Sequence, residues 1–289
     1  MKTLDTITGI RAALAGPRRA GRTIALVPTM GAFHAGHLSL MRRARVMCDV
    51  VVVSLFVNPT QFNDPADLTA YPRDFDRDAG LAAEIGVDYL FAPASSEVYP
   101  AGFATTVSVG GVTAPLEGAH RGRAHFAGVA TVVTKLFNIV GPDVAFFGQK
   151  DAQQALVIRR LVGDLDMPVR IEVCPTVRET DGLALSSRNA HLSATDRTRA
   201  AALHRALAAI QAAVSDGERD PSTAREYAVA ELQAVEIEPD YLELVSADTL
   251  APVGTIEGDV LAVVAARVGP TRLIDNQLIR ANHTGNGRP

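Results

Sequence analysis

The chain has 289 residues, of which 47% are hydrophobic and 21% charged, and its formal net charge is −4 at pH 7. This length allows two domains with buried cores, and the composition is that of an ordinary globular protein. The slight acidity argues against a general nucleic-acid binder, since phosphate backbones require a basic surface. No signal-type apolar region opens the chain and no later segment could span a bilayer, so we expect a cytoplasmic protein without membrane contacts.

Strand-like and helix-like patterns alternate through roughly the first 175 residues. The predicted strands are 23–27, 49–59, 87–93, 105–109, 143–148 and 169–177, and the predicted helices are 37–47, 73–86, 128–140 and 151–165. This alternation predicts an α/β fold with a parallel, Rossmann-like sheet. Ligands of such sheets bind at the carboxyl ends of the strands, where the polar motifs of this chain lie.

The rest of the chain has a different character. Alanine-rich helices are predicted at 194–217 and 221–235, and strands at 240–247, 260–268 and 272–279. We therefore expect a Rossmann-like domain over 1–176, a smaller α+β domain over 177–280, and a disordered tail over 281–289.

The two cysteines, Cys48 and Cys174, lie in apolar runs and lack metal-ligand spacing. We expect reduced core residues and not a disulfide.

The stretch "PTMGAFHAGHLSL" (28–40) follows an apolar strand and opens a helix. His34 and His37 are three residues apart and so share one helix face, and Gly31 and Gly36 allow close backbone approach. Free N–H groups at a helix start attract anions, which favours a nucleotide-phosphate site. Two packed histidines at a turn, or a metal site, are the alternatives. Zinc-binding pairs usually stand four apart around a glutamate, which is absent here.

Two further motifs offer cations or hydroxyls to phosphate. "FFGQKDAQQ" (146–154) places Lys150 and Asp151 at a strand end, where a lysine suits phosphate but also fits a solvated side chain beside a helix cap. "LALSSRN" (183–189) combines serines with Arg188, which is either a phosphate clamp or an ordinary polar turn.

The segment 54–74 leads from a central strand into a polar loop. Gln61 there either binds a small polar substrate or satisfies loop backbone. Asp74, Asp76 and Asp78 follow, and they either help to hold Mg²⁺ or form an exposed helix face. Neither a GxSxG elbow, nor a Cys/His pair, nor a GxGxxG fingerprint is present, so nucleotide-dependent transfer is the remaining class.

Taken together, "PTMGAFHAGH", "FVNPTQF", "YPRD", "HFAGVATVVTKLFNIV", "FFGQKD" and "SSRN" resemble the pantothenate synthetase family in order and spacing along most of the chain. Members join pantoate to β-alanine at the expense of ATP. The first motif also resembles the HxGH signature of class I aminoacyl-tRNA synthetases and related nucleotidyltransferases. The chain departs from the family at Gln149, where glutamate is frequent, and at Leu185, where methionine is usual.

The resemblance implies the roles of the site residues. His37 is expected as proton donor, with His34, Lys150 and Arg188 as the other catalytic groups. Gln61 is expected to bind pantoate and afterwards β-alanine, and Gln154 to bind pantoate. The expected ATP-binding residues are Met30, Gly31, Ala32, Phe33, His34, Ala35, Gly36, His37, Gly148, Gln149, Lys150, Asp151, Val177, Leu185, Ser186, Ser187 and Arg188.

The reaction implied is condensation of (R)-pantoate with β-alanine through a pantoyl adenylate, releasing AMP and pyrophosphate. Mg²⁺ is expected to accompany ATP, without protein ligands that the sequence identifies. A homodimer in which the second domain closes as a lid is also implied. The alternative activity is a nucleotidyltransferase acting on a phosphorylated acceptor, and the alternative class is a nucleotide-binding regulator without turnover.

Overall fold

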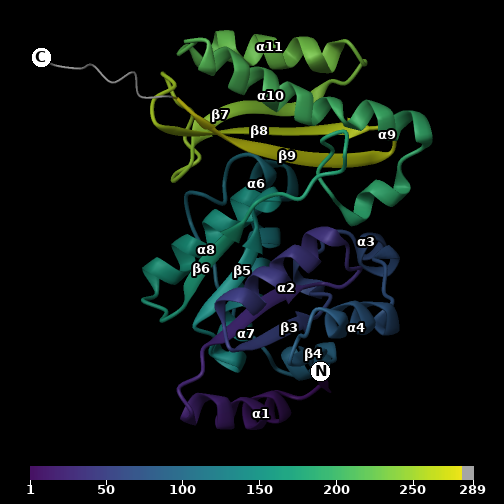
Figure 1. Ribbon diagram of the computed structural model, residues 1–289, viewed down its shortest axis with the longest axis vertical. Coiled ribbons are helices and arrows are strands. Elements are labelled where there is room, and N and C mark those ends of the chain that lie inside the picture. Colours follow the sequence, from purple (N-terminus) through teal and green to yellow (C-terminus); the bar gives the residue numbers. More distant parts are fainter. Residues whose placement is uncertain (282–289) are drawn as a thin grey trace, which may run out of the picture. The chain divides into compact units, whose positions relative to one another are not determined.

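The computed structural model describes residues 1–281, and the expected tail lies, from residue 282 on, outside this part of the chain. Two compact units divide the chain, the first comprising Met1–Val177 and the second beginning at Arg178 (Figure 1). Among the described residues, no helix combines the length and apolar content that a bilayer span requires.

The first unit is built from alternating strands and helices. Its strands are β1 (Lys2–Leu4), β2 (Ile24–Thr29), β3 (Val50–Leu55), β4 (Tyr89–Phe91), β5 (Val144–Gly148) and β6 (Arg170–Cys174). Its helices are α1 (Ile7–Arg19), α2 (Ala35–Met47), α3 (Pro65–Ala70), α4 (Phe75–Glu84), α5 (Ser95–Val98), α6 (Glu117–Arg121), α7 (Arg123–Val140) and α8 (Ala152–Asp164), with 3₁₀ turns η1 (Pro59–Gln61) and η2 (Gln149–Asp151).

The six strands form one parallel sheet in the order β1-β4-β3-β2-β5-β6. The α/β fold predicted from the alternating pattern is therefore confirmed. From β2 the chain proceeds outward through β3, and it later returns to the other side of β2 with β5. The direction of winding thus reverses between β2 and β5, which is where parallel sheets of this kind bind ligands.

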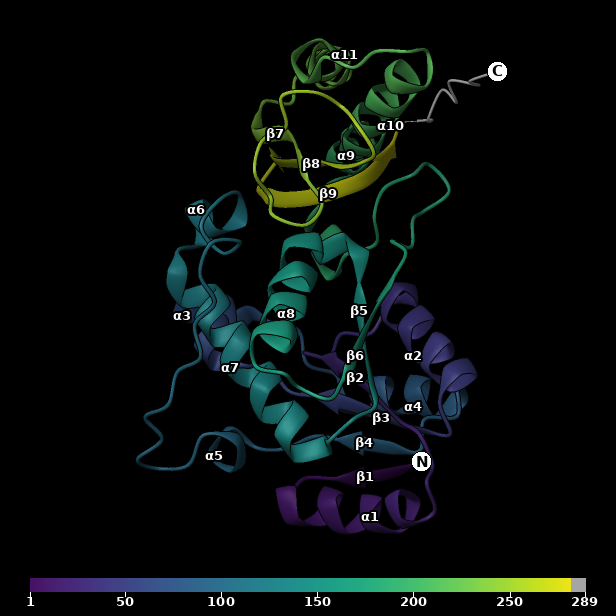
Figure 2. The ribbon, with the colours of Figure 1, turned by 90° about the vertical axis from the view of Figure 1, so that its left-hand side faces the viewer.

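Helices cover both faces of this sheet (Figure 2). Alternate residues of a strand point to opposite faces. Ile24 and Leu26 of β2 pack in the cluster that contains residues of α1, α7 and α8. Ala25 and Val27 pack in the cluster that contains residues of α2 and α4. Because both faces are buried, the β-branched run "VVVV" of β3 suits a central strand.

One expectation for this unit is wrong, and several of its elements were not predicted. Residues 105–109 form no strand, and the Val107 N–H instead donates to Thr131 Oγ1 of α7 at 2.9 Å. The sequence "TTVSV" alternates polar side chains with Val107 and Val109, which fits a strand pattern, but the segment pairs with no other strand. The elements β1 and α1 are absent from the expected set, although α1 buries Ile10 and Leu14 completely.

The second unit contains a three-stranded antiparallel sheet in the order β7-β8-β9 (Figure 1). Its elements are η3 (Ser187–His191), α9 (Ala194–Ala200), α10 (Ala202–Ser215), α11 (Pro221–Gln233), β7 (Pro239–Ser246), β8 (Asp259–Val268) and β9 (Thr271–Arg280). The predicted single helix over 194–217 is thus two helices that meet at Ala201. Small alanines of α10 and α11 pack against the aliphatic side chains of β8 in one core.

Cys48 and Cys174 are buried and free, as expected for core thiols. Burial raises the pKa of the Cys174 thiol to about 11, which keeps the thiol protonated and unreactive at neutral pH.

Candidate active site

The histidine motif forms the turn between β2 and α2. His34 is the N-cap of α2, and its Nδ1 accepts the Gly36 N–H at 3.1 Å. His37 Nδ1 in turn accepts the His34 N–H at 3.4 Å, so the two imidazoles form a reciprocal capping box. The ring centroids are 4.2 Å apart. The two histidines therefore form one preorganised helix cap and do not pack independently.

This arrangement fixes the tautomer of both rings. A neutral imidazole carries one proton, and a nitrogen that accepts an N–H cannot carry it. Since both Nδ1 atoms of His34 and His37 accept backbone N–H groups, the protons lie on Nε2. Each ring can therefore donate one hydrogen bond from Nε2 to a ligand.

Both imidazoles are neutral near pH 7. Burial, followed by repulsion from His34, lowers the pKa of His37 to about 3. Burial, followed by the charge of Lys150, lowers the pKa of His34. In the protein without nucleotide, His37 therefore offers a neutral Nε2–H donor and not an imidazolium. A triphosphate beside the ring would favour the protonated form and raise this pKa.

Glycine at position 36 leaves room for the His34 ring. A Cβ at this position would lie 2.8 Å from Cε1 and 2.9 Å from Nδ1 of the His34 ring. Gly31 has φ of +89° and Ala32 has φ of +53°, so the backbone passes twice through the left-handed region before α2 begins.

The turn is held from the side by α4. Asp78 is 1% exposed, and its two carboxylate oxygens accept the N–H groups of Ala32 at 2.7 Å and Phe33 at 2.8 Å. The interpretation of Asp74, Asp76 and Asp78 as an exposed helix face is wrong for Asp78. Asp76 is exposed, and Asp74 caps α4 by accepting the Arg77 N–H.

Lys150 and Asp151 lie in η2 directly after β5, the neighbour of β2 in the sheet. Both are close enough to the histidine pair for their charges to shift its pKa values, Lys150 downward and Asp151 upward. The predicted "FFGQKD" motif and the histidine turn thus occupy the same edge of the sheet.

Gln61 lies in η1 after β3, the other neighbour of β2, and its side chain is anchored. Asn58 is 1% exposed and donates through Nδ2 to Gln61 Oε1 at 3.0 Å and to the Gly128 carbonyl at 3.2 Å. Asn58 Oδ1 accepts the Tyr99 hydroxyl at 2.8 Å and the Thr60 hydroxyl at 2.9 Å. Asn58 is not among the expected site residues, although a polar residue ending a buried strand is a recognisable signal.

The backbone of η1 is pressed against α7. A Cβ on Gly128 would lie 2.3 Å from the Thr60 carbonyl oxygen. His125, three residues earlier on α7, meets the Gln61 carbonyl oxygen through Nδ1 at 2.8 Å. A carbonyl only accepts, so Nδ1 of His125 carries its proton. Burial lowers the pKa of His125, which leaves its Nε2 as an unprotonated acceptor.

The adjacent glutamines at the start of α8 have different surroundings. Gln153 is buried, and its carboxamide accepts the Glu117 N–H and donates to the carbonyls of Val112 and Pro115. It thereby holds the segment that leads into α6. Gln154, the residue predicted to bind pantoate, is only partly buried.

The "SSRN" motif belongs to the second unit. Ser186 caps η3 by accepting the Arg188 N–H, Leu185 and Ser187 are partly buried, and Arg188 is exposed. The preceding loop is anchored by Arg178, whose guanidinium makes a bidentate ion pair with the buried Asp275 at 2.5 and 3.0 Å. Val177 is the last residue of the first unit.

The residues of the first unit do not form a protein-built metal site. Within residues 1–281, no three His, Cys, Asp or Glu side chains come together as metal ligands. Both oxygens of Asp78 already accept N–H groups. Mg²⁺ often keeps its waters and binds through substrate phosphates, so these residues fit an ion that arrives on the triphosphate.

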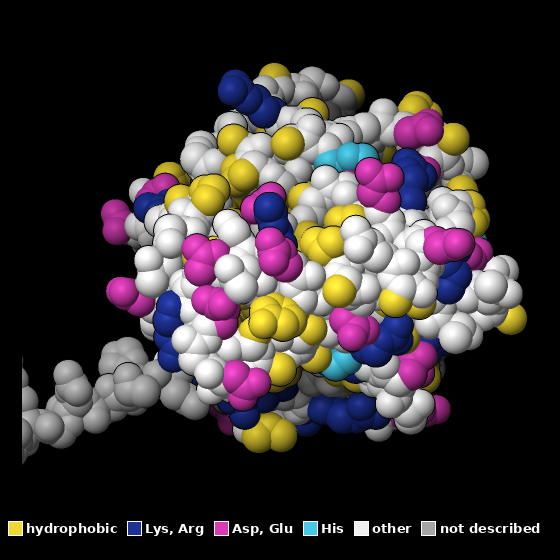
Figure 3. Space-filling model, turned by 90° about the horizontal axis from the view of Figure 1, so that it is seen from above, with side chains coloured by type: hydrophobic (Ala, Val, Ile, Leu, Met, Phe, Trp, Pro, Cys, Tyr) yellow, Lys and Arg dark blue, Asp and Glu magenta, His cyan; other side chains and the backbone are white. Residues whose placement is uncertain are grey.

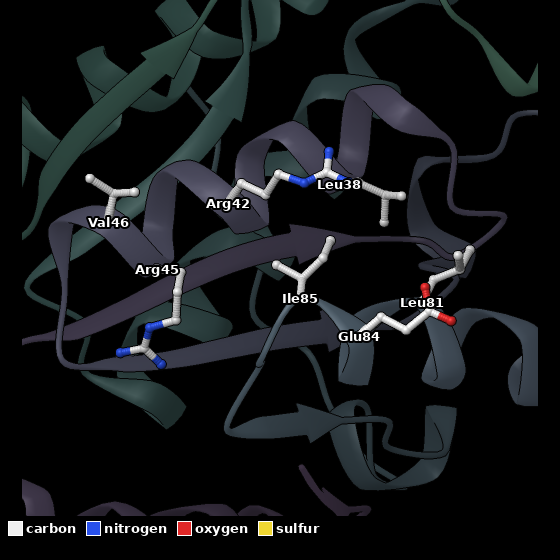
Figure 4. Close-up of a pocket in the computed structure, with 7 residues that line it drawn as sticks. All are labelled: Leu38, Arg42, Arg45, Val46, Leu81, Glu84 and Ile85. Atoms are coloured by element: carbon white, nitrogen blue, oxygen red, sulfur yellow. The ribbon is translucent and has the colours of Figure 1, made fainter.

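A hollow of about 440 Å³ lies elsewhere, between α2 and α4 (Figure 4). Arg42, Arg45 and Val46 line it from α2, and Leu81, Glu84 and Ile85 from the region of α4. None of the residues predicted to bind ATP or pantoate lines it. On the face of the molecule in Figure 3, basic and acidic side chains are interspersed.

Comparison with known proteins agrees with this geometry. A sequence model of the family described as pantoate–β-alanine ligase matches residues 2–278. The chain is 56% identical over 273 residues to a pantothenate synthetase of Cereibacter sphaeroides, covering 94% of this chain and 98% of that protein. It is 53% identical over 283 residues to the pantothenate synthetase of Moorella thermoacetica, covering 98% and 100%.

Solved structures give the same result. The crystal structure of pantothenate synthetase from Thermus thermophilus has a TM-score of 0.92 at 48% identity, covering 97% of this chain and 100% of that one. The pantoate–β-alanine ligase of Francisella tularensis, complexed with β-γ ATP and β-alanine, has a TM-score of 0.78 at 34% identity, covering 96% and 97%. With the histidine turn, the anchored Gln61 and the lysine at the sheet edge, these matches show that the chain belongs to the pantoate–β-alanine ligase family.

Proposed function

We propose that this chain condenses pantoate with β-alanine at the expense of ATP, giving pantothenate, AMP and pyrophosphate. The observation that carries the proposal is the meeting of the His34–His37 pair with Lys150 at the edge of the sheet where winding reverses. Members of the family catalyse this reaction, and this edge supplies donors for phosphate from two neighbouring strands.

The first step is attack of the pantoate carboxylate on the α-phosphorus of ATP. A new bond joins the carboxylate oxygen to phosphorus while the bond to the departing pyrophosphate oxygen breaks. Negative charge then grows on the phosphoryl oxygens and the leaving oxygen. We assign the Nε2–H groups of His34 and His37 and the ammonium of Lys150 to that charge. Preorganised donors of this kind each contribute about 3–4 kcal/mol to transition-state stabilisation.

In the second step the amine of β-alanine attacks the acyl carbon of the adenylate. The bond from acyl carbon to phosphate oxygen breaks, AMP leaves, and the amine proton passes to solvent. We assign Gln61 and Gln154 to the organic substrates. The Gln61 oxygen already accepts from Asn58, so the Gln61 Nε2 amide faces a substrate as a donor. A donor there suits a carboxylate or hydroxyl oxygen of pantoate.

The second unit is assigned the triphosphate through Leu185–Arg188, as the family resemblance implies. The Ser186 cap and the Arg178–Asp275 ion pair give this loop a defined shape within its own unit. The remaining residues of the histidine turn, Met30 to His37, and the stretch Gly148 to Asp151 are assigned to ATP, and Val177 to its adenine region. Mg²⁺ bound to the triphosphate would neutralise part of its charge.

The experiment that tests the proposal is isotope exchange with ATP and pantoate in the absence of β-alanine. If adenylation comes first, labelled pyrophosphate should enter ATP, and this exchange should require pantoate. Lys150→Ala should suppress exchange by roughly a hundredfold or more while the melting temperature stays the same, because Lys150 contributes charge and little packing. Lys150→Arg should remain poor, since a planar fork does not replace a compact ammonium.

Exchange without pantoate would mean that the enzyme itself is adenylylated, and the direct-attack mechanism would be wrong. Product analysis by mass separates the alternative activity, because a nucleotidyltransferase retains the nucleotide in its product whereas this reaction releases AMP. If folded protein binds ATP but shows neither exchange nor adenylate after rapid quenching, the chain is a regulator and not a ligase.

The homodimer and the cytoplasmic location stay predictions. The mass of the protein in solution, measured by light scattering across a range of concentrations, tests the dimer.

A further inference from the structure

Among residues 1–281, Asp78 is the one charged side chain that accepts hydrogen bonds from two backbone N–H groups of the histidine turn. Asp78 lies in the first turn of α4, and 46 positions separate it from Ala32 along the chain. Its exposure is 1%. A buried carboxylate is costly unless its oxygens are hydrogen-bonded, and here each oxygen accepts one N–H at 2.7 or 2.8 Å.

The position of these N–H groups explains why the turn needs an external partner. Gly31 and Ala32 both have positive φ, so this backbone is neither strand nor helix and lacks a ladder of its own. The strained conformation of Ala32 persists only if the surroundings over-determine it. Asp78 supplies that constraint by pairing with the N–H of Ala32 and of the residue after it.

The fit between turn and carboxylate is close. A Cβ on Gly31 would lie 3.0 Å from Asp78 Oδ2. The neighbouring Arg77 donates through Nη2 to the Phe33 carbonyl at 3.2 Å. Helix α4 thus contacts the turn through both an acceptor and a donor. Asp74 Oδ1 caps the same helix by accepting the Arg77 N–H.

We propose that Asp78 is a positioning residue that fixes the 31–33 turn and thereby sets the His34–His37 pair in the geometry that receives the ATP phosphates. The proposal rests on the proposed function only for the identity of the ligand. His34 directly follows Ala32 and Phe33, whose N–H groups Asp78 accepts. The backbone N–H of His34 donates to His37 Nδ1 and thereby sets the His37 tautomer. Release of the turn therefore disturbs both imidazoles at once.

The variant that tests this is Asp78→Asn, with Asp76→Asn as its matched control. Asparagine has nearly the same shape as aspartate but only one acceptor oxygen. Its NH₂ group would face one of the two N–H donors and leave that donor unpaired. Asp76→Asn removes the same charge from an exposed position of the same helix turn.

Three readouts separate positioning from other roles. Long-range ¹⁵N–¹H spectra report the tautomers of His34 and His37, titration of ATP with Mg²⁺ but without pantoate gives the nucleotide affinity, and Mg²⁺ titration at fixed ATP gives the metal requirement. Asp78→Asn should shift the NMR signals of both histidines and weaken ATP binding at least tenfold. The midpoint of the Mg²⁺ titration should stay unchanged. Asp76→Asn should change none of the three.

Unchanged histidine signals and ATP affinity in folded Asp78→Asn would overturn the proposal. A shifted Mg²⁺ midpoint with unchanged histidine signals would overturn it too, since Asp78 would then be a metal ligand. If Asp78→Asn does not fold, Arg77→Ala decides, because its exposed side chain acts on the turn through the hydrogen bond to the Phe33 carbonyl and an ion pair from Nη1 to Asp78 Oδ1 at 3.8 Å. The proposal is supported if Arg77→Ala shifts the histidine signals and weakens ATP binding at least twofold. Wild-type values of both would refute it.

The two proposals fail in different ways. If the proposed function is wrong, the wild-type protein forms no pantothenate, yet the histidine spectra still respond to Asp78→Asn.

Discussion

Asn58 Nδ2 lies 3.0 Å from Gln61 Oε1, and this contact decides which end of the Gln61 carboxamide is available to a ligand. The orientation of Asn58 is itself fixed by two backbone groups. Its nitrogen donates to the Gly128 carbonyl, and its oxygen accepts the Thr60 N–H at 3.4 Å. Neither contact could form if the Asn58 amide were reversed. The Gln61 oxygen therefore faces Asn58, and its nitrogen stays available as a donor.

Asn58→Asp should reverse this polarity. The new carboxylate cannot donate to the Gly128 carbonyl or to Gln61, so the Gln61 carboxamide should flip and present its oxygen to pantoate. We expect kcat/KM for pantoate to fall by about ten- to a hundredfold, the equivalent of a hydrogen bond to a charged group. ATP affinity should stay within twofold of wild type. Tyr99→Phe, which removes one hydroxyl from the same network, is the milder control, and an equal loss in both variants would contradict the polarity argument.

Gly128→Ala should dislodge η1 from α7. The added methyl group would lie 2.3 Å from the Thr60 carbonyl oxygen and 2.9 Å from the Gln61 nitrogen, both backbone atoms. We expect a loss of about 1–3 kcal/mol in the free energy of unfolding, together with a higher KM for pantoate. Gly163→Ala in α8 is the matched control, because no atom outside the chain neighbours and the helix's own backbone lies within 4 Å of the added methyl. There the better helix propensity should stabilise by about 0.5–1 kcal/mol. Chemical denaturation of both variants measures the difference.

The lowered pKa of His37 predicts how stability depends on pH. Between the ordinary value of 6.5 and the folded value of about 3, the unfolded chain binds a proton that the folded chain does not. The free energy of unfolding should therefore rise with pH in this window, by about 1.4 kcal/mol per pH unit from His37 alone. Acidification below 6.5 progressively removes this stability.

His37→Asn removes the titrating ring but keeps an acceptor for the His34 N–H, so the slope of stability against pH should decrease by about that amount. The control is Met41→Ala in the same helix, a fully buried and non-titrating position. It should lower stability by about 2–5 kcal/mol equally at every pH. Denaturation curves between about pH 7 and 4.5 decide the matter. An unchanged slope in His37→Asn would show that the ring is not held neutral by burial.

Alanine substitution should mainly lower stability at Gln153 and mainly weaken pantoate binding at Gln154. Gln153→Ala removes the hydrogen bonds of this carboxamide to the Glu117 N–H and to the carbonyls of Val112 and Pro115, so the free energy of unfolding should fall by roughly 1–3 kcal/mol. Gln154→Ala should leave stability within about 0.5 kcal/mol but weaken pantoate binding. Calorimetric titration with pantoate and thermal unfolding of both variants test the contrast. A stability loss at position 154 alone would reverse the two roles.

Local sequence signals are sufficient to predict those parts of the site that are formed by residues close together in the chain. The histidine turn is predictable because strand, glycines and helix follow one another within about 20 residues. Lys150 is predictable for the same reason. The sheet is predictable because both its faces are buried, which demands runs such as "VVVV" in β3.

The contacts that sequence reasoning misses join segments far apart in the chain. Asp78 looks like one of three acidic residues on a helix, and only the fold brings it to Ala32 and Phe33. Gln153 cannot be distinguished from Gln154 by composition, since its role depends on a loop about 40 residues earlier. The strand expected at 105–109 has suitable residues but no partner, and a strand exists only where another pairs with it.

The position of β1 has a consequence for biosynthesis. Lys2, Thr3 and Leu4 pair in register with Tyr89, Leu90 and Phe91, so during synthesis these residues must wait for more than 80 others before their partner strand exists. Closing so long a loop is slow compared with forming local structure. Until β4 emerges, the apolar face of α1 has no sheet beneath it, and a nascent chain is exposed to aggregation there. Slower translation of residues 20–90 should therefore change the yield of native protein more than equally slow translation after residue 180. The same holds for an N-terminal fusion partner that engages a chaperone.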